Sequence, residues 1–120
     1  MSTDQADTLI YCRVSERTTL LDVNEDPQER WQKALMLQRR QCEEFAAQLG
    51  YKVADYIEEI SDAVKLDREG LDDLYAYSES GAIKYVIVTD PSRLSFDRET
   101  CINIMNRLAG LGVEVVFASM

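Results

Sequence analysis

Histidine is absent from this 120-residue chain, and cysteine, proline and glycine are all scarce. The three cysteines, Cys12, Cys42 and Cys101, are an odd number and lack the paired spacing of metal ligands. This pattern argues against a disulfide scaffold, a zinc site and a histidine general base, and it is typical of a reducing, cytoplasmic setting. The glycines form no phosphate-binding loop, which disfavours a small-molecule phosphate-binding domain.

Long apolar runs are also lacking, and the segment from Met1 to Asp7 is too short and polar to direct export. We therefore expect no membrane partner, and we expect residues 1–7 to be disordered. The sequence has no internal repeat and no low-complexity tract. With 46% hydrophobic residues, the chain is predicted to form a single domain over residues 1–120, around one core.

Acidic residues outnumber basic residues by 22 to 13, which gives a formal net charge of −9. Such a chain repels a polyanion overall, so any contact with phosphate must be local and arginine-rich. The acidic pairs Glu58-Glu59 and Asp72-Asp73 are interpreted as partners of helix dipoles rather than as cation ligands. No metal site and no cofactor are predicted.

The spacing of apolar residues predicts four strands that alternate with three helices. Asp26 and Pro27 are typical of a helix start, and apolar residues at three- and four-residue steps continue this helix to Gly50. Two shorter helices are expected around residues 71–78 and 102–109. The strands are expected at residues 8–14, 52–57, 85–89 and 113–117, with polar loops at 15–26, 58–67 and 90–96.

This order predicts an α/β fold, a three-layer domain with a mainly parallel central sheet and helices on both faces. Functional sites in such domains lie at the carboxyl ends of the strands. The segment from Tyr11 to Ser15 leaves the first strand at that edge. Because side chains alternate along a strand, Tyr11, Arg13 and Ser15 share one face.

A hydroxyl beside a guanidinium suggests phosphate chemistry, although a serine that leaves a strand is also a common turn residue or helix cap. Two more polar loops, around Arg68 and Arg93, reach the same edge. Arg13, Arg68 and Arg93 can thus converge on Ser15, as phosphoryl transfer requires, because guanidiniums stabilise the charge that grows on phosphate oxygens. The alternative is that Arg68 is a solvated residue at a helix start and that Arg93 pairs with a carboxylate.

Other motifs give weaker interpretations. The stretch from Cys12 to Arg17 is one residue too short for a cysteine-phosphatase loop, and strand alternation points Cys12 away from Arg13, so we assign Cys12 to the core. Trp31 and Phe45 have helical spacing, which favours core packing over base stacking. A phospho-acceptor role for a strand-end aspartate is disfavoured because the first strand ends without an acidic pair.

Taken in order from about Leu9 to Ser119, these motifs resemble the catalytic domain of the serine recombinases, the resolvase and invertase family. The resemblance implies a site-specific DNA recombinase that breaks and rejoins DNA through a 5′-phosphoserine intermediate and frees a 3′-hydroxyl, without metal or nucleotide. It also implies DNA recombination or integration by a mobile element. The matching segments are Tyr11 to Ser15, Gln38, Asp67 to Leu71, and Ser92 to Ser95 followed by Asp97.

The resemblance also implies roles for single residues. Ser15 would be the nucleophile and Arg13 and Arg68 would be phosphate clamps. Arg93 would be a further clamp or would stabilise the leaving group. Tyr11 and Gln38 would support them. DNA would be the partner, and the full-length protein would self-associate as a dimer or tetramer through a helix that this chain lacks, with sequence recognition in a carboxyl-terminal region that it also lacks.

Two positions depart from the family pattern. Members usually carry an aspartate before the arginine that corresponds to Arg93, and a second arginine three residues after it, whereas this chain has Ser92 and Phe96. Losing a guanidinium that contacts the transition state costs orders of magnitude in rate. The alternative function is therefore a catalytically impaired, resolvase-like binding or regulatory module.

Overall fold

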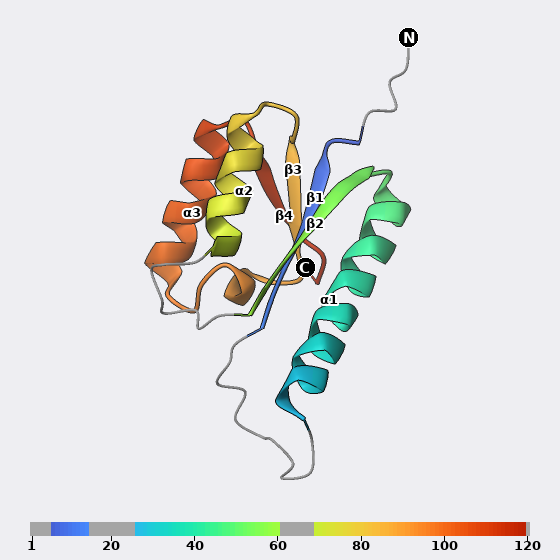
Figure 1. The fold of residues 1–120 in the computed structure, drawn as a ribbon. Coiled ribbons are helices and arrows are strands. Elements are labelled where there is room, and N and C mark those ends of the chain that lie inside the picture. The colour runs from blue at the N-terminus through green and yellow to red at the C-terminus, as the bar shows by residue number, and fades with distance from the viewer. Residues whose placement is uncertain (1–5, 15–25, 61–68, 120) are drawn as a thin grey trace.

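Four parallel strands form the centre of the described chain, which comprises residues 6–14, 26–60 and 69–119 of a computed structural model. The spatial order of the strands is β2-β1-β3-β4. Figure 1 shows helix α1 on one face of the sheet and α2 and α3 on the other. The strands are β1 (Thr8–Val14), β2 (Val53–Ile60), β3 (Tyr85–Val88) and β4 (Glu114–Phe117), and the helices are α1 (Pro27–Leu49), α2 (Glu69–Glu79) and α3 (Arg98–Gly110).

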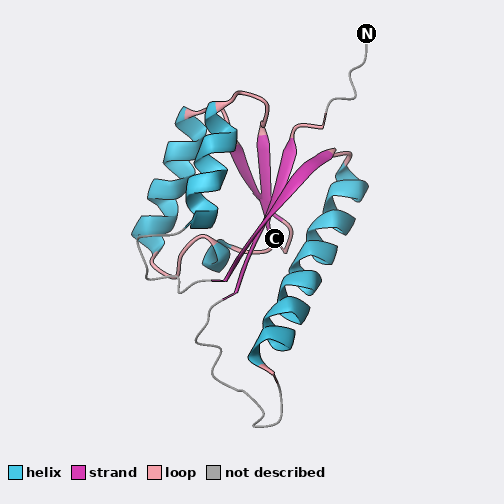
Figure 2. Cartoon of the chain, viewed as in Figure 1, coloured by secondary structure: helices cyan, strands magenta, loops and turns pink. Residues whose placement is uncertain are grey.

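The central strand β1 is buried along its whole length because helices cover both faces of the sheet. Figure 2 shows the three layers, with the strands between α1 and the other two helices. Alternate residues of β1 enter two different cores. Leu9 and Tyr11 pack in the core under α2 and α3, whereas Ile10, Cys12 and Val14 pack in the core under α1.

Helix α1 begins and ends as its sequence predicts. The Asp26 side chain accepts a hydrogen bond from the backbone N–H of Gln28 at 3.1 Å, which satisfies one of the unpaired donors of the first turn. Gly50 ends the helix in the left-handed conformation, with φ of 82°. Trp31 and Phe45 pack against the core under α1, which confirms their assignment to packing.

The predicted element order and the parallel sheet are confirmed, but β2 is longer than predicted. Its pairing with β1 continues to Ile60, so the prediction of a loop from Glu58 onward is wrong over three residues. The reason is that a neighbouring strand holds these polar residues in the ladder, with Arg13 opposite Glu59. Residues 1–5, part of the segment expected to be disordered, lie outside the described residues, whereas the carbonyl of Asp7 accepts the backbone N–H of Lys84 at 2.8 Å.

Within the described ranges, no helix combines the length and the apolar character needed to cross a membrane.

The burial of the three cysteines generates a first prediction. Burial raises the pKa of the Cys12 and Cys42 thiols from an ordinary value of 9.0 to about 12, and it raises the pKa of Cys101 as well. Because the thiolate is the reactive form, the shift for Cys12 lowers its reactive fraction by about 1,000-fold at mildly alkaline pH. We expect a thiol reagent to modify the folded protein very slowly and all three cysteines after denaturation.

The measurement is a time course of thiol modification with and without denaturant, followed by mass spectrometry. A Cys12 or Cys42 thiol that reacts as fast in the folded protein as in the denatured one would contradict the burial described here.

Candidate active site

The candidate active site lies where the carboxyl ends of β1 and β3 adjoin. The crossover from β1 passes through α1 on one face, and the crossover from β3 passes through α3 on the other. Open parallel sheets place their sites at such a switch point, because the two connections leave in opposite directions and open a crevice. Arg13 lies near the end of β1, and a short 3-10 helix, η1 (Pro91–Arg93), follows β3.

Two residues singled out from the sequence, Ser15 and Arg68, lie outside the described residues. The structure does place Tyr11, Arg13, Gln38 and Arg93. All four come together around the last residues of β1, although they originate from β1, α1 and η1.

The guanidinium of Arg13 is held under η1. Its Nε donates to the carbonyl oxygen of Arg93 at 2.8 Å, and its Nη2 donates to the carbonyl oxygen of Ser92 at 2.7 Å. The residue is 1% exposed, and the ring of Phe96 lies 5.4 Å from the guanidinium carbon, within the range of a cation–π contact. The planar guanidinium thus fixes the η1 segment against the end of β1.

Arg93 reaches back to the strand that carries Arg13. Its Nη1 donates to the carbonyl oxygen of Arg13 at 3.2 Å, and its Nε donates to the hydroxyl of Thr89 at 3.3 Å. The Nε also lies 3.5 Å from the Asp90 carboxylate, so Arg93 does pair with a carboxylate, as the alternative interpretation proposed. The two arginines therefore lie together, each bonded to the backbone of the other's segment.

Asp90 supplies a carboxylate beside Arg93, although the family's usual aspartate position holds Ser92. Asp90 caps η1 by accepting the backbone N–H of Ser92 at 3.0 Å, and the Ser92 hydroxyl also donates to it. Partial burial raises the pKa of Asp90, but hydrogen bonds from Ser92 and Thr89 and the charge of Arg93 outweigh burial and lower this pKa overall. Asp90 is thus ionised at neutral pH and holds Ser92 and Arg93 in one arrangement.

Gln38 acts on the backbone of β1. Its side-chain oxygen accepts the N–H of Arg13 at 3.1 Å, and its side-chain nitrogen donates to the carbonyl of Arg13 at 3.0 Å. The pairing of β1 with β3 stops at Ile10, so the amide of Gln38 satisfies backbone groups that β3 does not reach. A supporting role for Gln38 was implied by the resemblance. The structure shows its side chain bonded to the backbone of Arg13, which is two positions before Ser15 in the sequence.

Tyr11 contacts Glu59, which the sequence analysis interpreted only as a partner of a helix dipole and did not connect with the site. Its hydroxyl donates to Oε1 of Glu59 at 2.5 Å, and Oε2 of Glu59 accepts the backbone N–H of Gly70 at 2.6 Å. Glu59 is 7% exposed. Its signal in the sequence was the period-two pattern, because Glu59 follows Ile57 on the buried face of β2.

Phe96, Asp97 and Arg98, which follow the buried residues Leu94 and Ser95, are exposed. The Phe96 side chain is 66% exposed. Asp97 caps α3, where its carboxylate accepts the backbone N–H of Thr100 at 3.0 Å, and Arg98 is exposed on the first turn of that helix.

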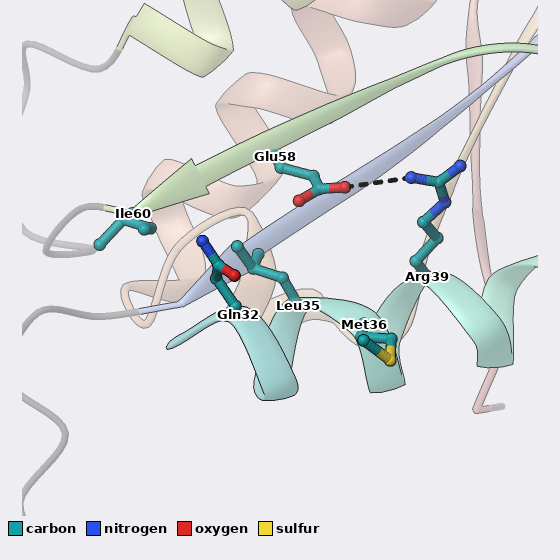
Figure 3. Close-up of a pocket in the computed structure, with 6 residues that line it drawn as sticks. All are labelled: Gln32, Leu35, Met36, Arg39, Glu58 and Ile60. Carbon is teal, nitrogen blue, oxygen red and sulfur yellow. Dashed lines mark hydrogen bonds and ion pairs between the residues drawn. The ribbon is translucent and has the colours of Figure 1, made fainter. Parts of the chain in front are cut away.

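A groove of about 420 Å³ lies between α1 and the edge strand β2. Figure 3 shows Arg39 and Glu58 facing one another across it, with nitrogen and oxygen 3.5 Å apart. Glu58 and Glu59 point to opposite faces of β2, so this groove is separate from the candidate active site. It is lined by Gln32, Leu35, Met36, Arg39, Glu58 and Ile60.

Solved structures of serine recombinase catalytic domains share this fold. The C-terminal catalytic domain of ISC1926 TnpA, an IS607-like serine recombinase, is 22% identical, with a TM-score of 0.77 over 93% of this chain and 70% of that chain. The N-terminal catalytic domain of TP901-1 integrase is 19% identical, with a TM-score of 0.72 over 93% and 76% of the two chains. A serine recombinase from Sulfolobus solfataricus is 20% identical, with a TM-score of 0.66 over 93% and 67%.

The fold is therefore that of the catalytic domains of serine recombinases. In sequence, residues 8–120 match the family described as Resolvase, N terminal domain, whereas no curated protein matches the chain. The chain belongs to the resolvase family, which confirms the resemblance inferred from its motifs.

The contacts of Gln38 generate a second prediction. In Gln38→Leu the buried N–H of Arg13 loses its acceptor, and an unsatisfied buried group costs roughly 1–3 kcal/mol. We expect the free energy of unfolding to fall by about 2 kcal/mol in chemical denaturation. The matched control is Gln41→Leu, an exposed glutamine of the same helix, for which we expect a change within about 0.5 kcal/mol. Equal losses in the two variants would contradict the backbone role of Gln38.

Proposed function

We propose that this chain is the catalytic domain of a serine site-specific recombinase that cleaves and rejoins DNA. The observation that carries the proposal is the meeting of Arg13 and Arg93 at the end of the strand that leads to Ser15. These arginines come from two strand ends that are 80 positions apart in sequence. Two guanidiniums at one sheet edge beside a serine are what a phosphoryl-transfer site requires.

The proposed reaction exchanges one phosphodiester for another. The oxygen of Ser15 attacks a phosphorus of the DNA backbone, the 3′-oxygen leaves and takes up a proton, and the 5′ end remains bonded to the serine. A 3′-hydroxyl then attacks the same phosphorus and releases Ser15. Because a phosphodiester is present before and after each step, rejoining needs no external source of energy.

The arginines have distinct proposed roles. Arg13 and Arg68 bind the non-bridging phosphate oxygens and stabilise the charge that grows in the transition state. Arg93 is a further clamp or stabilises the leaving oxygen. Gln38 fixes the backbone of β1 before Ser15. Tyr11, also on β1, supports this strand by bonding to Glu59 of the neighbouring strand β2.

DNA and further copies of the chain are the proposed partners. The net charge of −9 favours a division of labour in which phosphate contacts at the site are local and sequence recognition belongs to another region of a recombinase. We also propose a role in a mobile element, which the family resemblance implies, and a cytoplasmic location, which the cysteine pattern favours.

A catalytically impaired or regulatory module is the second candidate, and Phe96 is the observation that favours it. An exposed aromatic ring stands over Arg13 where family members usually carry a guanidinium, and a ring offers no donor to a phosphate oxygen. The position of Asp90 weakens this candidate, because a carboxylate still lies beside Arg93 in the absence of an aspartate at position 92.

The two candidates are separated by a covalent-adduct assay, which is our third prediction. The chain is fused to the dimerising, DNA-binding region of a related recombinase and mixed with nicked DNA that traps the cleaved intermediate. We expect a protein–DNA adduct that is resistant to denaturation and absent from the matched variant Ser15→Ala.

The double variant Ser92→Asp, Phe96→Arg tests the departures from the family pattern. Adduct from the double variant alone would support the impaired module, since one missing guanidinium contact is worth about 100- to 1,000-fold in rate. No adduct from either protein would contradict the assignment of Ser15.

A further inference from the structure

Glu59 is a buried carboxylate near the carboxyl end of β2 to which the reaction proposed above assigns no role. Its two oxygens accept hydrogen bonds from different elements, the phenol of Tyr11 on β1 at 2.5 Å and the backbone N–H of Gly70 on α2 at 2.6 Å. A single side chain therefore connects β1, β2 and the first turn of α2. A charge taken out of water is expensive, so this arrangement needs such bonds to be stable.

The first turn of α2 is shaped to receive this carboxylate. A Cβ atom at position 70 would lie 2.7 Å from Oε2 and 2.9 Å from Cβ of Glu59, closer than atoms can approach, so the helix comes this near only because residue 70 is glycine. The first N–H groups of a helix lack partners within it, and the helix dipole favours a negative charge there. Glu59 thus has both the contact and the electrostatics to fix where α2 begins.

We propose that Glu59 is a positioning residue for the recombinase reaction. It sets the start of α2 relative to the end of β1, and the inference rests on the proposed function. The β1 strand carries Arg13 opposite Glu59 and leads to Ser15, whereas Arg68 directly precedes α2 in the sequence. Arginines from two segments act on one phosphate only if the spacing of those segments is fixed, and displacements of about 1 Å cost on the order of 100-fold in rate.

The test compares two substitutions at this position with a control on the same strand. Glu59→Ala removes both acceptors. Glu59→Gln keeps a carbonyl oxygen for the N–H of Gly70 and presents an amide N–H to the phenol oxygen of Tyr11. The control is Glu58→Gln, the same change one residue earlier, on the exposed face of β2.

The first readout is the amide proton of Gly70 in an NMR spectrum, which is independent of any activity. An N–H that donates to a carboxylate at 2.6 Å resonates far downfield. We expect this signal to move upfield in Glu59→Ala and to stay in place in Glu58→Gln. An unchanged signal in Glu59→Ala would overturn the contact and the proposal with it.

The second readout is the rate of adduct formation per folded molecule, with DNA affinity measured separately. We expect Glu59→Ala to lose about 100-fold in rate at unchanged DNA affinity, and Glu59→Gln to recover to within about 10-fold of the original chain. Leu108→Ala, a core truncation in α3, controls for lower stability and should keep its rate per folded molecule.

The outcomes separate the two proposals. If Glu59→Ala forms adduct at the original rate although the Gly70 signal has moved, Glu59 is only structural and the positioning role is wrong. If the original chain forms no adduct, the proposed function fails and the positioning role fails with it, whereas the Gly70 signal still reports whether the carboxylate holds α2.

Discussion

The candidate active site of this domain depends on how the backbone of Arg13 is held after β1 parts from β3. A buried backbone amide must find a partner, and the ladder to β3 ends at Ile10. The side chain of Gln38 supplies both a donor and an acceptor there, in the manner of a neighbouring strand. The end of β1 is therefore held on one side by its pairing with β2, which continues to Val14, and on the other by this amide from α1.

The two arginines at this edge are oriented by different kinds of acceptor. Arg13 donates to the backbone carbonyls of Ser92 and Arg93, which direct its guanidinium. Arg93 lies beside the Asp90 carboxylate, which offsets part of its charge. Arg13 is the more deeply buried of the two, with the shorter hydrogen bonds, whereas the Arg93 side chain is 30% exposed.

Much of this arrangement could be predicted from the sequence because it is encoded locally. Alternation along β1 placed Tyr11 and Arg13 on one face and Cys12 in the core, and cap residues defined the ends of α1. The place of Glu59 in β2 and its contact with Tyr11 could not be predicted, because a run of acidic residues looks like a loop unless its register with β1 is known. The pairing of Asp90 with Arg93 likewise depends on the turn of η1. The sequence predicted only a loop over residues 90–96 and did not specify this turn.

The carbonyl acceptors of Arg13 have a consequence for how this site changes in evolution. Every amino acid presents the same carbonyl group, so the contacts that hold Arg13 under η1 do not depend on which side chains stand at positions 92 and 93. A different side chain at position 92 therefore leaves these two hydrogen bonds of Arg13 in place. It changes the surface around them. An aspartate at position 92 can be replaced by a serine while the guanidinium of Arg13 keeps its place. The side chains at this edge can therefore change during evolution without a change of fold.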